Sequence, residues 1–299
     1  MKRLVLLAAI AATTLAQTVN AQTPFFSRTD YIGAFGTTNW TQGWANFDPQ
    51  NSTYATTNDV LEGEITSDRT LDKSKVYLLK GFVYVKNGAT LTIPAGTIIR
   101  GDKATKGTLI VTRGSKLEAT GTLAEPVVFT SNEPAGDRDY GDWGGIIILG
   151  NAPVNPTGGT ATIEGGVNNA NGDGIYGGTN DDDNSGSLTY VRLEFPGIAF
   201  QPDNEINGLT MGGVGRGTTM HHIQISFCGD DAFEWFGGNV DAKYLISHRT
   251  WDDGFDCDFG YSGRVQFGID IKDPRIADVS GSNGFEVDND GTGSDNTPN

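Results

Sequence analysis

Short apolar runs separated by glycine-containing turns fill the chain after about residue 60. Runs such as Val76–Leu79 and Thr108–Val111 alternate with turns such as Asn87-Gly88 and Arg113-Gly114. Strands of this length and spacing are typical of a coil with three short faces or of a β-sandwich. Gly or Pro interrupts every long window with helical periodicity, so the pattern predicts an all-β protein.

A repeat in the C-terminal third distinguishes these two architectures. The repeated units are Asp230-Asp231-Ala232-Phe233-Glu234, Asp252-Asp253-Gly254-Phe255-Asp256 and Ser282-Asn283-Gly284-Phe285-Glu286. The first two Phe are 22 residues apart, and an independent set, Ile223, Leu245 and Phe267, has the same spacing. A repeat of this length, rich in β-formers and Gly, predicts a parallel β-helix with coils about 4.8 Å apart.

The first 21 residues have the organisation of a signal peptide. Lys2-Arg3 precedes the apolar run Leu4–Leu15, and small residues around Ala21 provide a cleavage site. The apolar run is too short for a membrane span. We therefore expect the secretion machinery to export the protein, which is then secreted or held at the outer cell surface.

The remaining sequence predicts a single β-helix domain with an N-terminal cap. Aromatic residues are frequent in residues 22–60, which we expect to cover the end of the stack, although they could instead bind a ligand. The β-helix spans residues 61–290, and a Gly/Asn/Asp-rich insertion at 155–187 follows the buried run Asp142–Leu149. Residues 291–299 form a polar tail at which we expect the sequence to be truncated.

Composition restricts the partners. The net charge of −16 argues against nucleic acid and anionic lipid, and it suits a protein that holds divalent cations. Gly accounts for 42 of the 299 residues, about twice the usual share. The repeat places Cys257 beside Trp235, so we expect Cys257 and Cys228 to be unpaired, with a disulfide as the alternative.

The repeat also predicts stacked carboxylates, with Asp230 over Asp252, Asp231 over Asp253 and Glu234 over Asp256. Two carboxylates about 5 Å apart repel by roughly 3 kcal/mol at an effective dielectric constant near 20, so a compensating interaction is required. One possibility is that each Asp accepts backbone N–H groups of its turn. A second is calcium bound by Asp231, Asp253, Glu234 and Asp256. A third is a catalytic set of Asp230, Asp231, Asp252 and Asp253.

Two other acidic segments are weaker calcium candidates. Asp288, Asp290 and Asp295 follow the spacing of the first half of a calcium loop, with a solvated linker as the alternative. Asn169 to Asp173 together with Asp181-Asp182-Asp183 could bind calcium, or could form a disordered acidic loop. His221 and His222 are neighbours on a predicted strand, so we expect them to point to opposite faces and not to share a metal.

Four segments carry a resemblance to a known family. They are Gly141-Asp142-Trp143-Gly144-Gly145-Ile146, Asp230-Asp231-Ala232-Phe233-Glu234, Trp251-Asp252-Asp253-Gly254-Phe255-Asp256 and Tyr261-Ser262-Gly263-Arg264-Val265-Gln266-Phe267. On these segments the chain resembles a family of exported proteins of Bacteroidetes-type bacteria, most without assigned activity. The resemblance implies a right-handed parallel β-helix of the pectin-lyase-like class.

Enzymes on this fold suggest an alternative function. Gly229-Asp230-Asp231 resembles the paired-aspartate segment of polygalacturonase-type hydrolases, but the Gly-His-Gly and Arg-x-Lys segments of those enzymes are absent from this sequence. Pectate lyases use calcium and an Arg base, for which Arg249 and Arg264 are candidates. The leading hypothesis is an exported, non-catalytic protein that binds a glycan or another surface component, with structural calcium. The alternative is a lyase or glycoside hydrolase acting on acidic polysaccharide.

Overall fold

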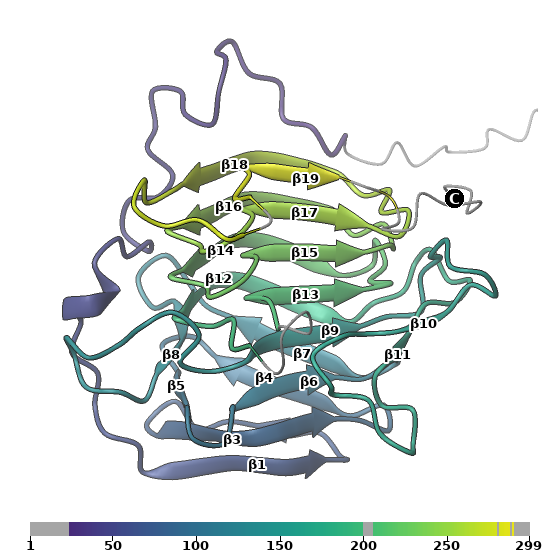
Figure 1. Cartoon of the computed structure of the whole chain (residues 1–299), viewed down its shortest axis with the longest axis horizontal. Coiled ribbons are helices and arrows are strands. Elements are labelled where there is room, and N and C mark those ends of the chain that lie inside the picture. The colour runs from purple at the N-terminus through teal and green to yellow at the C-terminus, as the bar shows by residue number, and fades with distance from the viewer. Residues whose placement is uncertain (1–23, 200–205, 280, 288, 290–299) are drawn as a thin grey trace, which may run out of the picture.

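The chain forms a right-handed parallel β-helix with three walls (Figure 1). The computed structural model describes residues 24–199, 206–279, 281–287 and 289. Wall A consists of β2 (Arg69–Thr70), β4 (Thr90–Pro94), β7 (Lys116–Thr120) and the first halves of β12 (Gly186–Glu194), β14 (Thr219–Ser226), β16 (Ala242–His248) and β18 (Val265–Ile271). Wall B begins with the first halves of two strands, β1 (Asp59–Ile65) and β3 (Val76–Val85). It continues with the whole of β5 (Ile98–Gly101) and β8 (Val127–Ser131), and then with the second halves of β12, β14, β16 and β18.

Wall C carries the repeated motifs. It consists of the second halves of β1 and β3, followed by β6 (Thr108–Val111), β9 (Gly145–Leu149), β13 (Leu209–Gly212), β15 (Phe233–Phe236), β17 (Phe255–Asp258) and β19 (Phe285–Val287). In this wall Phe233 lies directly beside Phe255, and their rings stack with centroids 5.4 Å apart. Both rings are buried, so each contributes roughly 1.5–3 kcal/mol of hydrophobic stabilisation. The predicted stacking of this column is confirmed.

The second predicted column is wrong at its last member. Ile223 pairs with Leu245 as expected, but Leu245 pairs with Gly268 and not with Phe267. The turn between β17 and β18 contains one more residue than the turn between β15 and β16. Residues of β18 therefore lie 23 positions, and not 22, after their partners on β16. Phe267 therefore leaves the core and stacks on Tyr244, with ring centroids 4.9 Å apart.

Walls A and B meet at a corner of stacked rings with left-handed backbone conformation. Tyr190, His222, Tyr244 and Phe267 all have φ between 50° and 65°. The His222 ring stacks on Tyr190 and on Tyr244, at 4.4 Å in both cases. This conformation breaks the alternation of a strand and brings Nδ1 of His222 within 2.9 Å of Nδ1 of His221. The expectation that these two side chains point to opposite faces is therefore wrong.

The N-terminal segment starts above β18 at one end of the stack and then runs down the flank of the β-helix to β1 (Figure 1). We call residues 24–58 the strap. Its backbone pairs with the side-chain amides of Gln266 on β18 and Gln224 on β14, and farther along the stack its Ala55 carbonyl accepts from Arg100 on β5. The strap includes one 3₁₀ turn, η1 (Pro49–Asn51). One of its aromatic residues, Trp44, makes a lateral contact, because it is buried against Tyr190 and His222.

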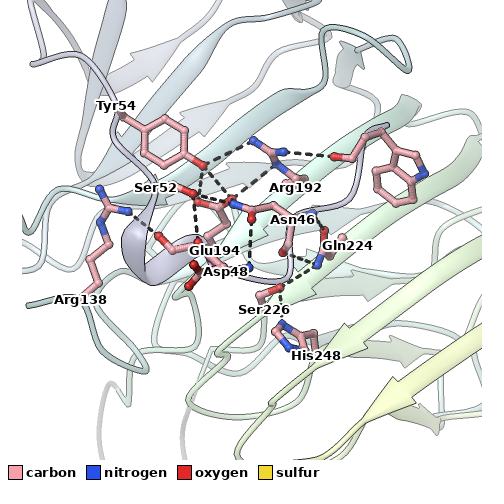
Figure 2. A network of polar contacts seen from close by, with 12 residues as sticks. Asn46, Asp48, Ser52, Tyr54, Arg138, Arg192, Glu194, Gln224, Ser226 and His248 are labelled. Atoms are coloured by element: carbon pink, nitrogen blue, oxygen red, sulfur yellow. Dashed lines mark hydrogen bonds and ion pairs between the residues drawn. The ribbon is translucent and has the colours of Figure 1, made fainter. Parts of the chain in front are cut away.

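A polar network fixes the middle of the strap to wall B (Figure 2). Glu194 is buried and accepts hydrogen bonds from the Tyr54 hydroxyl at 2.8–2.9 Å and from Asn46 at 3.3 Å. Arg192 lies 3.5 Å from the same carboxylate and donates to the Trp44 carbonyl. Each charged side chain of this network therefore has a polar partner, as burial requires.

The insertion after β9 is folded against the outer surface of wall C. It contains the antiparallel pair β10 (Ala161–Thr162) and β11 (Ile175–Tyr176), and its Ile163, Val167 and Tyr176 pack with Ile147 and Leu149 of β9. This contact explains why every residue of β9 is buried. Asp173, one of the weaker calcium candidates, forms an ion pair with buried Lys86 at 2.6 Å, so an ammonium group occupies that position.

The two cysteines are unpaired, as the repeat predicted. Cys257 lies directly beside Trp235 on the neighbouring strand. Burial raises the pKa of the Cys228 thiol well above its usual value and that of Cys257 to about 12, so neither is a reactive thiolate at neutral pH.

Candidate metal centre

The outward-facing column of wall C changes from apolar to acidic along the stack. Its members in successive coils are Tyr84, Ile110, Ile147, Thr210, Glu234, Asp256 and Glu286. The insertion covers the apolar members, and the carboxylates continue the column beyond it. The predicted stacking of Glu234 beside Asp256 is confirmed by the register of β15 and β17.

A chain of side-chain acceptors crosses four coils at the turn before this column. Oδ1 of Asn207 accepts the backbone N–H of Asp231 at 3.2 Å, and Oδ1 of Asp231 accepts that of Asp253 at 2.8 Å. Asp253 in turn accepts the backbone N–H of Asn283. We call these four residues the Asx chain. The first of the three predicted compensations placed the donor N–H groups in the same turn, whereas here each acceptor receives an N–H group of the next coil.

Asp253 is committed to this structural role. Its side chain is fully buried, and the Asn283 amide group also donates to its Oδ2 at 3.4 Å. It is not among the carboxylates that converge in the two clusters described below. Among the described residues, the two clusters therefore include Asp231 but not Asp253.

Two groups of carboxylates converge beside the Asx chain. Asp231, Glu234 and Asp256 each place an oxygen within 4.8 Å of the others, and Asp230, Asp231 and Asp252 do the same. Because calcium binds oxygen at 2.3–2.6 Å, ligands on opposite sides of one ion lie up to about 5 Å apart. Either group therefore fits around a single calcium ion, and Asp231 belongs to both.

The electrostatic environment of the first group is unfavourable for bare carboxylates. Burial raises the pKa of Glu234 well above its usual value, and the neighbouring carboxylates of Glu164, Asp231 and Asp256 raise it further. Burial and the charges of Asp230 and Asp256 likewise raise the pKa of Asp231. The backbone N–H of Asp253 opposes this shift only in part. These carboxyls therefore require either protons or a bound cation at neutral pH.

A neutral oxygen lies one coil away in the same outward column. Thr210 precedes Glu234 in the outward column, and its side chain is only 1% exposed. Within the described part of the chain, its hydroxyl has no hydrogen-bond partner. A buried hydroxyl without a partner costs about 1–3 kcal/mol. It is therefore a candidate ligand, in keeping with the preference of calcium for oxygen donors.

Several of the contributing residues were not anticipated from the sequence. Asn207 donates from Nδ2 to both Glu164 and Glu234, and so orients the buried end of the cluster. A signal for Asn207 and Thr210 was present, because Asn207-Gly208-Leu209-Thr210 follows the pattern of Asn283-Gly284-Phe285-Glu286. Glu164 belongs to the insertion, outside the repeat, and no spacing rule places it.

The remaining predicted site residues lie elsewhere. Asp288, Asp290 and Asp295 lie outside the described residues. Arg264, a candidate lyase base, is at the opposite turn and pairs with Asp241. Arg249, the other candidate, lies 3.9 Å from Asp273 and over the Phe227 ring. The structure therefore pairs both arginines with carboxylates outside the two clusters.

The fold and the cluster together define a parallel β-helix protein with an acidic outer column. A family described as pectate-lyase like beta helix domain matches residues 63–299, and the chain belongs to this family. This confirms the β-helix class implied by the resemblance. No curated protein and no solved structure gave a match. The described part of the chain contains no helix with the length and apolar character of a membrane span.

Proposed function

We propose that this protein is an exported, non-catalytic β-helix that binds a glycan or another surface component and is stabilised by calcium. The ion is held by Asp231, Glu234 and Asp256, with the Thr210 hydroxyl beside them. Asp230 and Asp252 provide further oxygens on the solvent side, where both are only partly buried.

The observation that carries the calcium proposal is the burial of Asp231 and Glu234 among other carboxylates. Both side chains are less than 10% exposed, and the charged groups that raise their pKa values are all acidic. A divalent ion offsets this repulsion directly, whereas the amides of the Asx chain offset it only for the residues they contact.

The same burial supports a non-catalytic role. In glycoside hydrolases, a general acid and a second carboxylate flank the glycosidic bond that is cleaved. The polysaccharide must therefore be able to reach both groups at the same time. Asp231 and Asp253 are buried and accept backbone amides, and so they are poorly placed for such a reaction. Export rests on the basic and apolar organisation of residues 1–21, and the net charge of −16 suits an extracellular protein.

Calorimetric titration with calcium tests the proposal. We expect calcium to bind the EDTA-treated full-length chain and to raise its melting temperature, because a ligand at 100 times its Kd stabilises the native state by about 2.7 kcal/mol. Glu234→Gln should weaken binding by at least about tenfold. The matched control is Glu125→Gln, which removes an exposed carboxylate paired with Lys73. A melting temperature insensitive to both EDTA and calcium would contradict the proposal.

An assay with uronate polymers distinguishes the enzymatic alternative from the proposed non-catalytic function. The wild-type protein with calcium should produce no absorbance from unsaturated products and no new reducing ends. Sustained product formation that Asp231→Asn abolishes, without a change in melting temperature, would assign catalysis to the cluster instead.

A further inference from the structure

The strands β13, β15 and β17 end at one edge of the stack (Figure 1), and a second polar site lies at the turns that follow them. The three turns that follow these strands lie in successive coils and line a cleft of about 510 Å³. We call it the turn cleft. Its polar side chains are Asp181, Arg216, Asn239, Asp241, Ser262 and Arg264.

The turn cleft is built from hydrogen-bonded pairs that hold its side chains in place. Oδ1 of Asn239 accepts the backbone N–H of Arg216 at 2.8 Å, and its Nδ2 donates to Asp181 at 3.0 Å. Oδ1 of Asp241 accepts both the backbone N–H of Arg264 at 3.0 Å and its Nε at 2.9 Å. The planar groups are therefore positioned before any ligand arrives, which reduces the entropy lost on binding.

Both guanidinium groups of the turn cleft are paired with carboxylates. The Arg216 guanidinium lies 2.7 Å from Asp182, and the Arg264 guanidinium pairs with Asp241. Asp181 adds a further negative charge. An anionic ligand would thus find no uncommitted guanidinium here and would meet an acidic protein, whereas a neutral ligand with many hydroxyls can use donors and acceptors side by side.

The shape of the cleft agrees with an extended ligand. Three successive coils span roughly 10 Å at the inter-strand distance of about 4.8 Å. An aromatic surface adjoins one end, because Phe25 and Phe26 of the strap lie 4.7 and 6.0 Å from the Arg264 guanidinium, and Phe26 is 54% exposed. Rings of this kind offer an apolar face to the C–H groups of a sugar.

We infer that the turn cleft binds a neutral oligosaccharide, through hydroxyls that bridge the Asp, Asn and Arg side chains of three coils. The inference rests on the proposed glycan binding and locates it at the opposite end of the wall C strands from the Asx chain. It assigns calcium a structural role and the sugar a separate site.

Titration calorimetry with neutral hexasaccharides (of glucose, xylose and mannose) and with hexagalacturonate tests this assignment on the calcium-loaded full chain. We expect at least one neutral hexasaccharide to bind more tightly than the uronate. Arg216→Ala and Asp181→Ala alter exposed side chains and should each weaken that binding by about tenfold, as expected for the loss of a charge-assisted hydrogen bond. The control Lys73→Ala removes an exposed ion pair elsewhere and should leave the affinity unchanged.

The outcomes separate the cleft from the calcium proposal. Sugar binding that persists in Arg216→Ala and Asp181→Ala would overturn the cleft assignment while leaving glycan binding intact. A preference for the uronate, or no heat with any of the four oligosaccharides, would also overturn it. Loss of calcium binding in Glu234→Gln with normal sugar affinity would support both sites as independent.

Discussion

Oδ1 of the Asp231 carboxylate accepts the backbone N–H of Asp253, one coil farther along the stack, at 2.8 Å. The same carboxylate belongs to the cluster that Asp231 forms with Glu234 and Asp256. One residue thus connects the Asx chain to the candidate metal centre. Substitutions along the chain can separate the two roles, because amides and carboxylates share the oxygen acceptor but not the charge.

Removing the acceptor at Asp253 should destabilise the protein more than removing its charge. Asp253→Ala leaves the backbone N–H of Asn283 without its buried partner, which costs about 1–3 kcal/mol. Asp253→Asn retains the acceptor oxygen and should lose less. Urea unfolding of both variants in calcium measures the difference. Equal losses in the two variants would show that the charge of Asp253, and not its hydrogen bonds, matters.

The stacked Phe column should contribute strongly to the unfolding free energy only where neighbouring coils bury the rings. Phe255 is 1% exposed and stacks on Phe233, so Phe255→Ala should cost about 3–5 kcal/mol. Phe285 continues the same column but is 66% exposed, so Phe285→Ala should cost only about 0.5 kcal/mol. Thermal unfolding followed by circular dichroism tests this contrast. Similar losses at both positions would be inconsistent with the stacked core.

These columns show how far the sequence specifies the fold. The 22-residue spacing of Phe233 and Phe255 was sufficient to predict the wall that contains them, because a coil of constant length keeps equivalent residues in register. The spacing failed at Phe267, where one added turn residue moved the side chain from the core to an outer stack. Coil length is set by turns, and a single inserted residue in a turn leaves no mark in the hydrophobic pattern.

The strap should detach locally when its buried anchor is removed. Trp44 is 1% exposed and contacts the rings of Tyr190 and His222, so Trp44→Ala opens a cavity under the strap. Limited proteolysis with mass spectrometry should then detect cleavage within residues 24–58 that is absent from the wild type. Ile32→Ala, which alters a fully exposed strap residue, should leave the cleavage pattern unchanged. Equal protection of both variants would contradict the anchoring role of Trp44.

The site was predictable to the extent that it follows the repeat. The stacking of Glu234 beside Asp256 and the link between Asp231 and Asp253 both came from one spacing. The contact of the cluster with the insertion did not follow from this spacing. Glu164 lies 43 residues before its partner Asn207, in a hairpin that is not part of the repeat. The repeat spacing also could not distinguish carboxylates that accept backbone N–H groups from carboxylates that bind a metal, since both roles use the same oxygen atoms.

The unfolding free energy in EDTA should fall as the pH rises through the native pKa values of Glu234 and Asp231. The pKa values of Glu234 and Asp231 are raised in the native state, so this state binds more protons than the unfolded chain above the unfolded carboxyl pKa of about 4. Stability from these groups is therefore present at low pH and lost as the pH rises through their native pKa values. Burial lowers the pKa values of His222 and His248 to about 4 in the native state. The unfolded chain therefore binds more protons at these residues as the pH falls below about 6.5, and the native state loses stability there.

Melting curves between pH 6.5 and 9 avoid the histidine range and isolate the carboxyls. Wild type in EDTA should lose melting temperature as the pH rises, and Glu234→Gln should lose less, because Gln carries no titrating proton. Each kcal/mol corresponds to about 2–4 °C for a protein of this size class. Saturating calcium should flatten the wild-type slope, since the ion replaces the protons that the native carboxyls would otherwise retain. Identical slopes for wild type and Glu234→Gln, with or without calcium, would mean that Glu234 is ionised and compensated by a partner other than a proton or a cation.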